Sequence, residues 1–290
     1  MTCPATCSYS RMKMTNNILS WSDLDDNGHL FVANGHQFYE LRKALAKRLL
    51  QTDPENHGKW QQLDISESDA HATHELLNVS IWYQMPQSMR AAQNLIHPDL
   101  PWAEKHFQER VGGKAINPGV EHANWPYHAG QVMLHQNGGK YDHNYMERFW
   151  PTDLNDPHPV LTKTRPWAGY RFPIGDLDDL VRQLRADIGT RQAYLPIFFP
   201  EDTGATQGQR VPCTLGYHFI VREGKLHVQY NMRSCEIYRH FTNDVYMAVR
   251  LAEWVRDRIN PELDLGQLTM NIVSFHGFVG DTTEIERFLD

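Results

Sequence analysis

The stretch that most constrains the fold runs from Val211 to Asp244. Within it, residues 215–221 and 226–231 alternate apolar and polar side chains, which is the period of a β-strand with one buried face. The four residues between them, Arg-Glu-Gly-Lys, are typical of a tight turn. The pattern predicts a β-hairpin, and the sheet that contains it would bring the two ends of the stretch together.

Reactive and charged side chains flank this hairpin. Cys213 precedes the first strand, Arg233 and Ser234 close the second, and Asp244 follows Arg233 by eleven residues. A thiol, a guanidinium, a hydroxyl and a carboxylate would therefore meet at one end of the hairpin. Such a set suits a nucleophile beside an anion-binding group. Taken singly, these residues could also be a buried cysteine, a surface arginine and a helix-capping aspartate.

The composition narrows the class of protein. With 290 residues, 41% of them hydrophobic, the chain can bury a sizeable core in an α/β or α+β fold. The net charge of −7 argues against a broad nucleic-acid-binding surface, so an anionic ligand needs a local cluster of Arg or Lys. No apolar run is long enough to span a bilayer, and residues 1–17 lack the apolar core of a signal peptide. Four scattered cysteines fit a reducing cytoplasm better than a disulfide framework.

Sixteen histidines raise the question of a metal site. The segment His71-Ala-Thr-His74-Glu75 has the look of a zinc motif, but its order is not HExxH and no cysteine pair accompanies it. The sequence therefore predicts no metal.

Periodicity along the rest of the chain predicts one domain of mixed helices and strands. We expect residues 1–18 to form a flexible tail and residues 19–290 a single domain, because no repeat or linker interrupts them. Predicted helices cover residues 36–50, 100–111, 176–185 and 245–259, with a short helix at the C-terminus. Predicted strands outside the hairpin cover residues 76–83, 193–199 and 268–275. Residues 114–170 are rich in aromatic side chains, which favours a shaped pocket wall, although part of the region could simply be packing.

The hairpin and its flanks resemble the catalytic core of the thymidylate synthase superfamily. The resemblance rests on Pro-Cys at 212–213, Gly-Lys in the hairpin turn, and Arg-Ser twenty residues after the cysteine. It covers residues 185–280 and is closest to the cytidylate-directed branch, the phage-type dCMP hydroxymethylases. In that branch the cysteine is followed by Thr, as Cys213 is here, and an Asn-Asp pair like 243–244 follows. The resemblance implies a mixed β-sheet flanked by helices, and a homodimer packed sheet against sheet.

The resemblance also implies the chemistry. A pyrimidine is a poor nucleophile at C5, and adding the Cys213 thiolate to C6 makes C5 able to attack an electrophilic one-carbon unit. A fixed guanidinium beside a thiol favours the thiolate, and Arg233 fits that demand. Arg233 and Ser234 resemble the family's phosphate site. Thr-Arg-Gln at 190–192 resembles a Ser-Arg-Arg segment that reaches the partner subunit's phosphate, so Arg191 takes that role and Gln192 stands where the second Arg would be. Cys235 is expected to be structural.

Asp244 predicts the choice of base. Uracil offers a donor at N3 and an acceptor at O4, which suit an amide, whereas a carboxylate accepts from the cytosine N4 amine and would repel O4. Thymidylate synthases have Asn at this position and the cytidylate enzymes have Asp. A mispaired buried polar group costs roughly 1–3 kcal/mol, enough to set the preference. The alternative is an ordinary helix N-cap before residue 245, a role that Asn243 could also take.

Residues farther from the hairpin carry the rest of the predicted site. The family's catalytic Glu lies in a helix some twenty residues before a Trp of the folate pocket, which matches Glu104 and Trp125; Glu109 and Glu75 are alternatives, with Glu75 placed before a strand. Tyr145 resembles the family's site Tyr. His276 matches the histidine that holds the sugar 3′-hydroxyl, while Phe278 replaces the accompanying Tyr. These are implications of the resemblance.

The sequence thus predicts folate-dependent C5 hydroxymethylation of a cytosine nucleoside monophosphate, dCMP, with 5,10-methylenetetrahydrofolate as co-substrate. Two alternatives stay open. One is C5 methylation of dCMP or dUMP, and the other is a nucleotide-binding homologue without turnover. The identity of the sugar and the choice between methyl and hydroxymethyl product also stay open.

Overall fold

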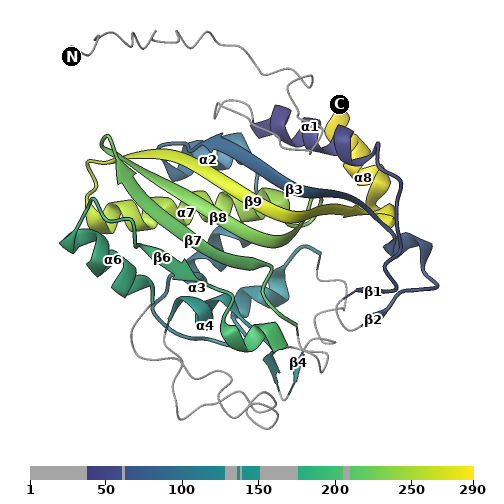
Figure 1. The fold of residues 1–290 in the computed structure, drawn as a ribbon, viewed down its shortest axis with the longest axis horizontal. Helices are drawn as coiled ribbons and strands as arrows, with labels where there is room; N and C mark the ends of the chain where they lie inside the picture. Colours follow the sequence, from purple (N-terminus) through teal and green to yellow (C-terminus); the bar gives the residue numbers. More distant parts are fainter. Residues whose placement is uncertain (1–37, 61–62, 128–135, 138, 151–175, 205–209) are drawn as a thin grey trace, which may run out of the picture.

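A five-stranded sheet organises the described part of the chain (Figure 1). The computed structural model describes residues 38–290 apart from 61–62, 128–135, 138, 151–175 and 205–209. The predicted tail at residues 1–18, Cys3 and Cys7, and much of the aromatic-rich region lie outside the described residues. Within the described part, no helix has the length and apolar character needed to cross a membrane.

The sheet has the order β3-β9-β8-β7-β6. Its strands are β3 (Thr73–Gln84), β6 (Tyr194–Pro196), β7 (Thr214–Arg222), β8 (Lys225–Glu236) and β9 (Asp264–Phe278). All neighbours are antiparallel except β8 and β9, which are parallel because a long helix connects them. The predicted hairpin β7–β8 is confirmed. Glu223 and Gly224 in its turn both have positive φ, a conformation for which Gly at the second position is well suited.

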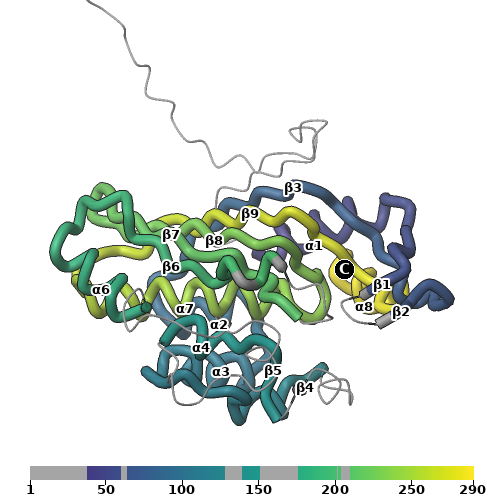
Figure 2. Tube along the Cα trace, turned by 60° about the horizontal axis from the view of Figure 1, so that its bottom comes forward, coloured from purple at the N-terminus to yellow at the C-terminus, as the bar shows by residue number. Residues whose placement is uncertain are grey.

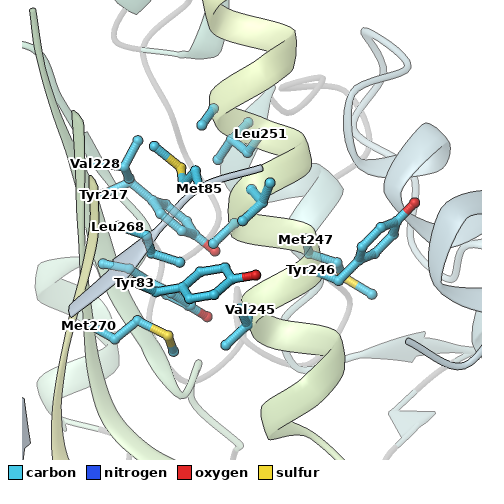
Figure 3. Packing of buried hydrophobic residues seen from close by; sticks show 14 of the residues in the cluster. Tyr83, Met85, Tyr217, Val228, Val245, Tyr246, Met247, Leu251, Leu268 and Met270 are labelled. Atoms are coloured by element: carbon cyan, nitrogen blue, oxygen red, sulfur yellow. The ribbon is translucent and has the colours of Figure 1, made fainter. Parts of the chain in front are cut away.

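Helix α7 (Phe241–Ile259) packs along one face of the sheet and forms the centre of the core. Its predicted apolar stripe is confirmed, since residues 245, 248, 249, 252 and 255 are all buried. Figure 3 shows Tyr83, Tyr217 and Met270 from the strands facing this helix. Each large apolar side chain buried here stabilises the fold by roughly 1.5–3 kcal/mol. The core therefore fixes α7, and with it the residues that begin this helix.

The remaining helices surround this core. They are α1 (Phe38–Leu49), α2 (Met89–Ile96), α3 (Trp102–Arg110), α4 (Tyr145–Phe149), α6 (Leu177–Ala186) and α8 (Thr282–Glu286). Figure 2 shows α7 against the sheet, with α3 and α4 farther from the sheet than α7. Two short hairpins complete the described elements: β1 (Lys59–Trp60) with β2 (Leu63–Asp64), and β4 (Gln136–Asn137) with β5 (Lys140–Tyr141).

Three boundaries differ from the sequence prediction. The strand predicted at 193–199 is only β6, because Pro196 has no N–H and Ile197 and Phe198 both donate to the one carbonyl of Leu215, at 3.0 and 3.1 Å. Strand β3 begins at Thr73, so Glu75 lies inside a strand and not before it. Helix α7 begins at Phe241, which places Asp244 inside its first turn.

The helix-cap interpretation of Asp244 and Asn243 is therefore wrong. The N-cap is His240, which makes no side-chain capping hydrogen bond. Asn243 instead binds Asp99: its Nδ2 donates to Asp99 Oδ2 at 2.8 Å, and its Oδ1 accepts from the Asp99 N–H at 3.0 Å. Asp244 is thus free to take a role other than capping.

Candidate active site

A cavity of about 830 Å³ opens where the hairpin ends meet α3, the N-terminus of α7 and the end of β9. This volume lies in the range of small-molecule sites. The structure brings most of the predicted site residues together in its wall: Cys213, Arg233, Ser234, Asp244, Tyr145, Trp125 and His276. Glu104, Glu109, Glu75 and Arg191 are not among the residues that line it.

Cys213 lies directly before the first residue of β7, and its sulfur contacts two hydrogen-bond donors from β8. Ser234 Oγ lies 3.4 Å from Cys213 Sγ, and Arg233 Nη2 lies 3.6 Å from it. The adjacent backbone is held by the same strand, because the Arg233 N–H donates to the Cys213 carbonyl at 2.8 Å. A thiolate at this position would accept both side-chain hydrogen bonds. The arrangement is that of a nucleophile with its donors already in place.

A chain of hydroxyls runs beside the nucleophile. Thr214 Oγ1 lies 2.9 Å from the Tyr145 hydroxyl and 2.8 Å from the Tyr230 hydroxyl. Burial raises the pKa of Tyr145 well above its ordinary value, so its hydroxyl keeps its proton. The Arg110 guanidinium lies 4.0 Å from the centre of the Tyr145 ring and holds it in place. Tyr145 can therefore donate or relay a proton near Cys213 but cannot act as a phenolate base.

Asp244 projects into the cavity from the first turn of α7. Burial raises the pKa of its carboxyl to about 6, with Arg110 opposing the shift. The Cys235 sulfur lies 3.7 Å from Asp244 Oδ2. Burial raises the pKa of the Cys235 thiol well above its usual range, so the thiol stays protonated and donates to Asp244. Cys235, which the sequence predicts to be structural, lines the cavity and supports Asp244.

His276 lines the cavity from β9, and a short chain of hydrogen bonds connects it to β3. Its Nδ1 lies 3.4 Å from Ser274 Oγ, and the Ser274 hydroxyl donates to Glu75 Oε1 on the neighbouring strand β3. Burial lowers the pKa of His276, so the ring is neutral near pH 7. Glu75 thus helps to orient His276 from the neighbouring strand. Phe278 packs edge-on against His276 at 5.8 Å and also lines the cavity.

Trp125 forms part of an aromatic wall. Its ring stacks on His240 at 5.0 Å between ring centres, and Trp102 of α3 lies 6.4 Å away. All three residues line the cavity. Flat apolar surfaces of this kind suit a planar heteroaromatic ring.

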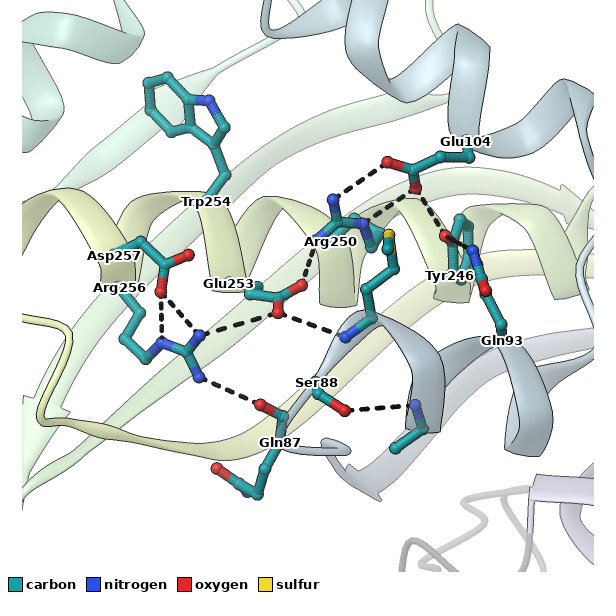
Figure 4. A network of polar contacts seen from close by, with 12 residues as sticks. Gln87, Ser88, Gln93, Glu104, Tyr246, Arg250, Glu253, Trp254, Arg256 and Asp257 are labelled. Atoms are coloured by element: carbon teal, nitrogen blue, oxygen red, sulfur yellow. Dashed lines mark hydrogen bonds and ion pairs between the residues drawn. The ribbon is translucent and has the colours of Figure 1, made fainter.

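Glu104 lies away from this cavity, which contradicts its predicted catalytic position. Its carboxylate accepts two hydrogen bonds from Arg250 at 3.0 Å each, and one from the Tyr246 hydroxyl at 2.6 Å (Figure 4). Those partners lie on α7, so Glu104 fastens α3 to α7. The physical reason is helical phase: Trp102, His106 and Arg110 share the face of α3 toward the cavity, and residue 104 is on another side.

We expect Glu104→Gln to affect stability and not chemistry. The Glu104–Arg250 pair is largely shielded from solvent, so removing the carboxylate should lower the free energy of unfolding by about 1–3 kcal/mol. Turnover of the folded variant should stay within a few-fold of wild type. Urea unfolding and steady-state kinetics check the two parts. A stable variant with a hundredfold loss of kcat would restore Glu104 to the active site.

Glu109 reaches the cavity only through another residue. Its Oε2 lies 3.4 Å from His106 Nδ1, and the Arg110 Nε donates to His106 Nε2 at 3.1 Å. Burial lowers the pKa of His106 to about 4, so the imidazole is neutral, with Nδ1–H directed at Glu109 and Nε2 accepting. This chain ends at Arg110, which lies over Tyr145. Glu109 therefore sets the orientation of His106 and Arg110.

Arg191 lies on an exposed loop that leads into β6. Its carbonyl contacts His218 Nε2 at 2.8 Å. The side chain does not line the cavity of its own chain. The predicted contact with a partner subunit stays a prediction.

Sequence reasoning missed several residues of the cavity wall. The main ones are His106, Arg110, His143, Arg210 and Glu236. His106 and Arg110 could have been found from the sequence, since they follow Trp102 at four-residue steps on one face of the predicted helix. Arg210 precedes the Pro-Cys pair by two residues, but no periodic pattern marks it. Glu236 accepts from the Tyr238 and Arg239 N–H groups and closes the turn before α7, and burial raises its pKa to about 7.

Within the residues that the structure describes, no three His, Cys, Asp or Glu side chains gather as a metal site. The His71–His74 segment has other partners: His71 Nδ1 contacts Ser68 Oγ at 2.7 Å and His74 Nδ1 contacts the Thr52 carbonyl at 2.7 Å.

Comparison with known proteins points in one direction. No protein-family model matches the chain. A protein of Methanococcoides burtonii described as "Putative thymidylate synthase" is 21% identical over 234 residues, which cover 81% of this chain and 85% of the relative. A protein of Methanothermobacter thermautotrophicus with the same description is 30% identical over 120 residues, which cover 41% of this chain and about half (51%) of that relative.

The fold is similar to that of a solved structure. The thermostable thymidylate synthase A from Bacillus subtilis superposes with a TM-score of 0.59 at 15% identity, covering 89% of this chain and 84% of that one. The expected α/β fold, a mixed sheet flanked by helices, is therefore confirmed, and it matches a thymidylate synthase fold.

Proposed function

We propose that this protein transfers a one-carbon unit from 5,10-methylenetetrahydrofolate to C5 of a cytosine nucleoside monophosphate, dCMP, and that the product is the 5-hydroxymethyl nucleotide. The observation that carries the proposal is the meeting of Cys213, its two donors and Asp244 in one cavity of a thymidylate synthase-like fold. The similarity to proteins described as thymidylate synthases supports folate-dependent C5 transfer.

Cys213 acts as the nucleophile. Its thiolate adds to C6 of the pyrimidine, the C5–C6 double bond opens, and the electron pair is delocalised toward N3. C5 thereby becomes nucleophilic and forms the new carbon–carbon bond. C5 then loses its proton and tetrahydrofolate leaves as the amine, which gives an exocyclic methylene on C5. Water adds to this methylene while the Cys213 thiolate leaves C6, and the aromatic ring is restored. Tyr145 and Thr214, linked by their hydroxyls beside Cys213, are placed to pass the C5 proton to solvent.

Asp244 selects cytosine. A pKa of about 6 makes the protonated carboxyl accessible near neutral pH. In that form Asp244 donates its O–H to the unprotonated N3 of cytosine and accepts from the N4 amine. Donation to N3 also withdraws electrons from the ring while Cys213 attacks C6. Uracil presents O4 where cytosine has its N4 amine, and the ionised form of Asp244 would meet this oxygen without a hydrogen-bond donor.

The folate co-substrate fits the remaining part of the cavity. A planar pterin ring would lie against Trp125, Trp102 and His240, which already form a stacked wall. When bound, methylenetetrahydrofolate supplies a one-carbon unit at the oxidation level of formaldehyde. The choice between hydroxymethyl and methyl product then depends on whether water or a hydride reaches the exocyclic carbon. Thr214 and Asp244 carry the resemblance to the hydroxymethylating branch.

We also propose a cytoplasmic homodimer. The sheet face away from α7 carries a row of hydrogen-bonded amides and hydroxyls from Ser80, Asn271 and Asn231, at 3.0 Å per contact. Trp82 and Val273, 38% and 52% exposed, lie on the same strands. Packing two such faces together would cover these side chains, and the exposed Arg191 would extend to the partner's cavity.

Mass spectrometry of the product tests the proposal. The enzyme is incubated with methylenetetrahydrofolate and, in parallel, dCMP, CMP or dUMP. We expect a gain of CH2O on dCMP alone. A gain of CH2, with dihydrofolate as co-product, would replace the hydroxymethyl assignment by methylation. Turnover of dUMP alone would contradict the role of Asp244. Binding of dCMP without any product would favour a nucleotide-binding homologue.

A further inference from the structure

The cavity holds more positive charge than the chemistry at Cys213 uses. Its wall contains four arginines: Arg110, Arg210, Arg233 and Arg239. Arg239 is committed to Asp281, since its Nη2 lies 2.7 and 2.5 Å from the two carboxylate oxygens. Arg110 donates through Nε to His106, covers the Tyr145 ring, and its charge stabilises the ionised form of Asp244. Two arginines remain as candidates to bind an anionic ligand.

Arg233 is largely occupied by its own loop. Its Nε donates to the Pro212 carbonyl at 2.9 Å, and its Nη2 to the Val211 carbonyl at 3.0 Å. The remaining contacts are Nη1 to Ser234 Oγ at 3.2 Å and Nη2 to Cys213 Sγ at 3.6 Å. A guanidinium has five N–H groups, so these contacts leave Arg233 one. Arg233 therefore fixes the loop before the nucleophile, and cannot by itself grip a phosphate with two donors.

The guanidinium of Arg210, unlike that of Arg233, is not used for contacts within the described part of its own loop. Its backbone N–H donates to Asp142 Oδ2 at 2.9 Å, which anchors the residue in the cavity wall. Its guanidinium makes no hydrogen bond within the part of the chain that the structure describes, and its Nε is buried. Burial lowers the pKa of Arg210, and the nearby Cys213 and Asp142 offset that shift only in part. A largely desolvated guanidinium with an unpartnered Nε is costly unless a ligand accepts its hydrogen bonds.

His143 provides a second orphaned nitrogen in the same wall. Its Nδ1 is buried and has no partner among the described residues. Burial, followed by the charge of Arg210, holds the pKa of His143 well below its usual range. The ring is therefore neutral and offers one N–H donor. His143 and Arg210 both line this cavity.

We propose that Arg210, assisted by His143, is the principal phosphate-binding residue of the nucleotide site. The inference rests on the proposed function and moves the main phosphate contact from Arg233 to Arg210. A phosphate dianion supplies a charged hydrogen-bond partner for Arg210 and acceptor oxygens for both orphaned nitrogens. Arg210 also precedes Cys213 by only three residues, so the group that anchors the substrate and the group that attacks it belong to one loop.

The γ- and α-carboxylates of the folate tail offer the same anionic-oxygen chemistry. The test therefore compares dCMP, deoxycytidine, tetrahydrofolate and inorganic phosphate as ligands, by calorimetry and thermal shift. The variants are Arg210→Gln, Arg210→Lys and the control Arg182→Gln. The control removes the same charge from an exposed position on α6, outside the cavity.

For Arg210→Gln we expect the Kd of dCMP to rise about 10–100-fold, the loss typical of a charged hydrogen-bonded contact. Deoxycytidine and tetrahydrofolate should bind as they do to wild type. Inorganic phosphate should raise the Tm of wild type and of Arg182→Gln, and not that of Arg210→Gln. Arg210→Lys should recover part of the affinity for dCMP, because it keeps the charge without the planar fork. Without ligand, Arg210→Gln should melt at or above the wild-type Tm, since the substitution removes the cost of desolvating a cation that has no hydrogen-bonded carboxylate among the described residues.

Other results would overturn the inference in distinguishable ways. Wild-type protein that binds neither dCMP nor deoxycytidine would refute the proposed function itself. If wild type binds dCMP and Arg210→Gln binds it equally well, the function stands and the phosphate assignment falls. A loss confined to tetrahydrofolate would assign Arg210 to the folate carboxylates. A lower Tm for unligated Arg210→Gln, with dCMP and deoxycytidine weakened alike, would make Arg210 a structural residue.

Discussion

Replacing Cys213 with alanine is expected to lower kcat by about 10⁴-fold or more, because no other group can add to C6. Binding of dCMP should change by only a few-fold, since the phosphate and base contacts remain. Steady-state assays measure kcat and calorimetry measures dCMP binding, and both use the same protein preparation. In wild type, a 5-fluoro cytosine nucleotide should leave an adduct on the peptide that contains Cys213, because C5 then carries no proton to lose.

Cys235→Ala is the matched control for this experiment. It removes a thiol from the same strand end and the same cavity, and it weakens the contact to Asp244 without touching the nucleophile. We expect it to keep turnover within about tenfold of wild type, since one weak hydrogen bond is lost. Equal losses in the two variants, or an adduct on the Cys235 peptide, would contradict the assignment of Cys213.

Asp244→Asn is expected to reverse the preference for the base. An amide matches N3–H and O4 of uracil and mismatches cytosine, so two polar contacts change sense. The ratio of kcat/KM for dCMP over dUMP should fall by roughly 10²–10³-fold. Competition between the two nucleotides, read by mass spectrometry of the products, measures this ratio directly. An unchanged ratio would mean that the base is recognised elsewhere.

The same substitution is expected to stabilise the fold above pH 6. The pKa of Asp244 is raised to about 6 from its ordinary 3.8, chiefly by burial. The contribution of Asp244 to the free energy of unfolding is fully present below pH 3.8, where the carboxyl is protonated in both the folded and the unfolded chain. This contribution is lost as the pH rises through the folded pKa, because the carboxyl then ionises in a desolvated site. Asn cannot ionise, so the variant should gain roughly 2 kcal/mol over wild type at pH 7.5 and little near pH 4. Urea unfolding at both pH values provides the measurement.

The hairpin and α7 could be predicted from the sequence because short-range patterns determine them. Strict alternation and the Gly224 turn set β7 and β8, and the apolar stripe of α7 sets its buried face. The proximity of Cys213 to its donors Arg233 and Ser234 could also be predicted, because the hairpin brings residues 213 and 233 together. In all these cases the relevant contacts are close in sequence or follow from one period.

The sequence predictions failed where contacts between segments distant in the sequence determine the orientation of a side chain. Glu104 has helical sequence neighbours that fit a catalytic role, yet the guanidinium of Arg250 on another helix determines which way its carboxylate faces. Asp244 was open to interpretation as a cap, because the start of α7 depends on the Glu236 turn that closes the site. Arg210 and His143 carry no pattern at all, since they are defined by what they lack in the folded chain.

Strand β9 has a consequence for the order in which the chain assembles. It lies between β8, its parallel neighbour, and β3, whose residues Thr73–Gln84 are made almost two hundred residues earlier. During synthesis β3 must therefore wait, unpaired, until nearly the whole chain has left the ribosome. His276 and the Glu75–Ser274 relay exist only after that closure. The part of the cavity around His276 is thus the last to form, and truncation at the C-terminus would leave β3 as an exposed, aggregation-prone edge.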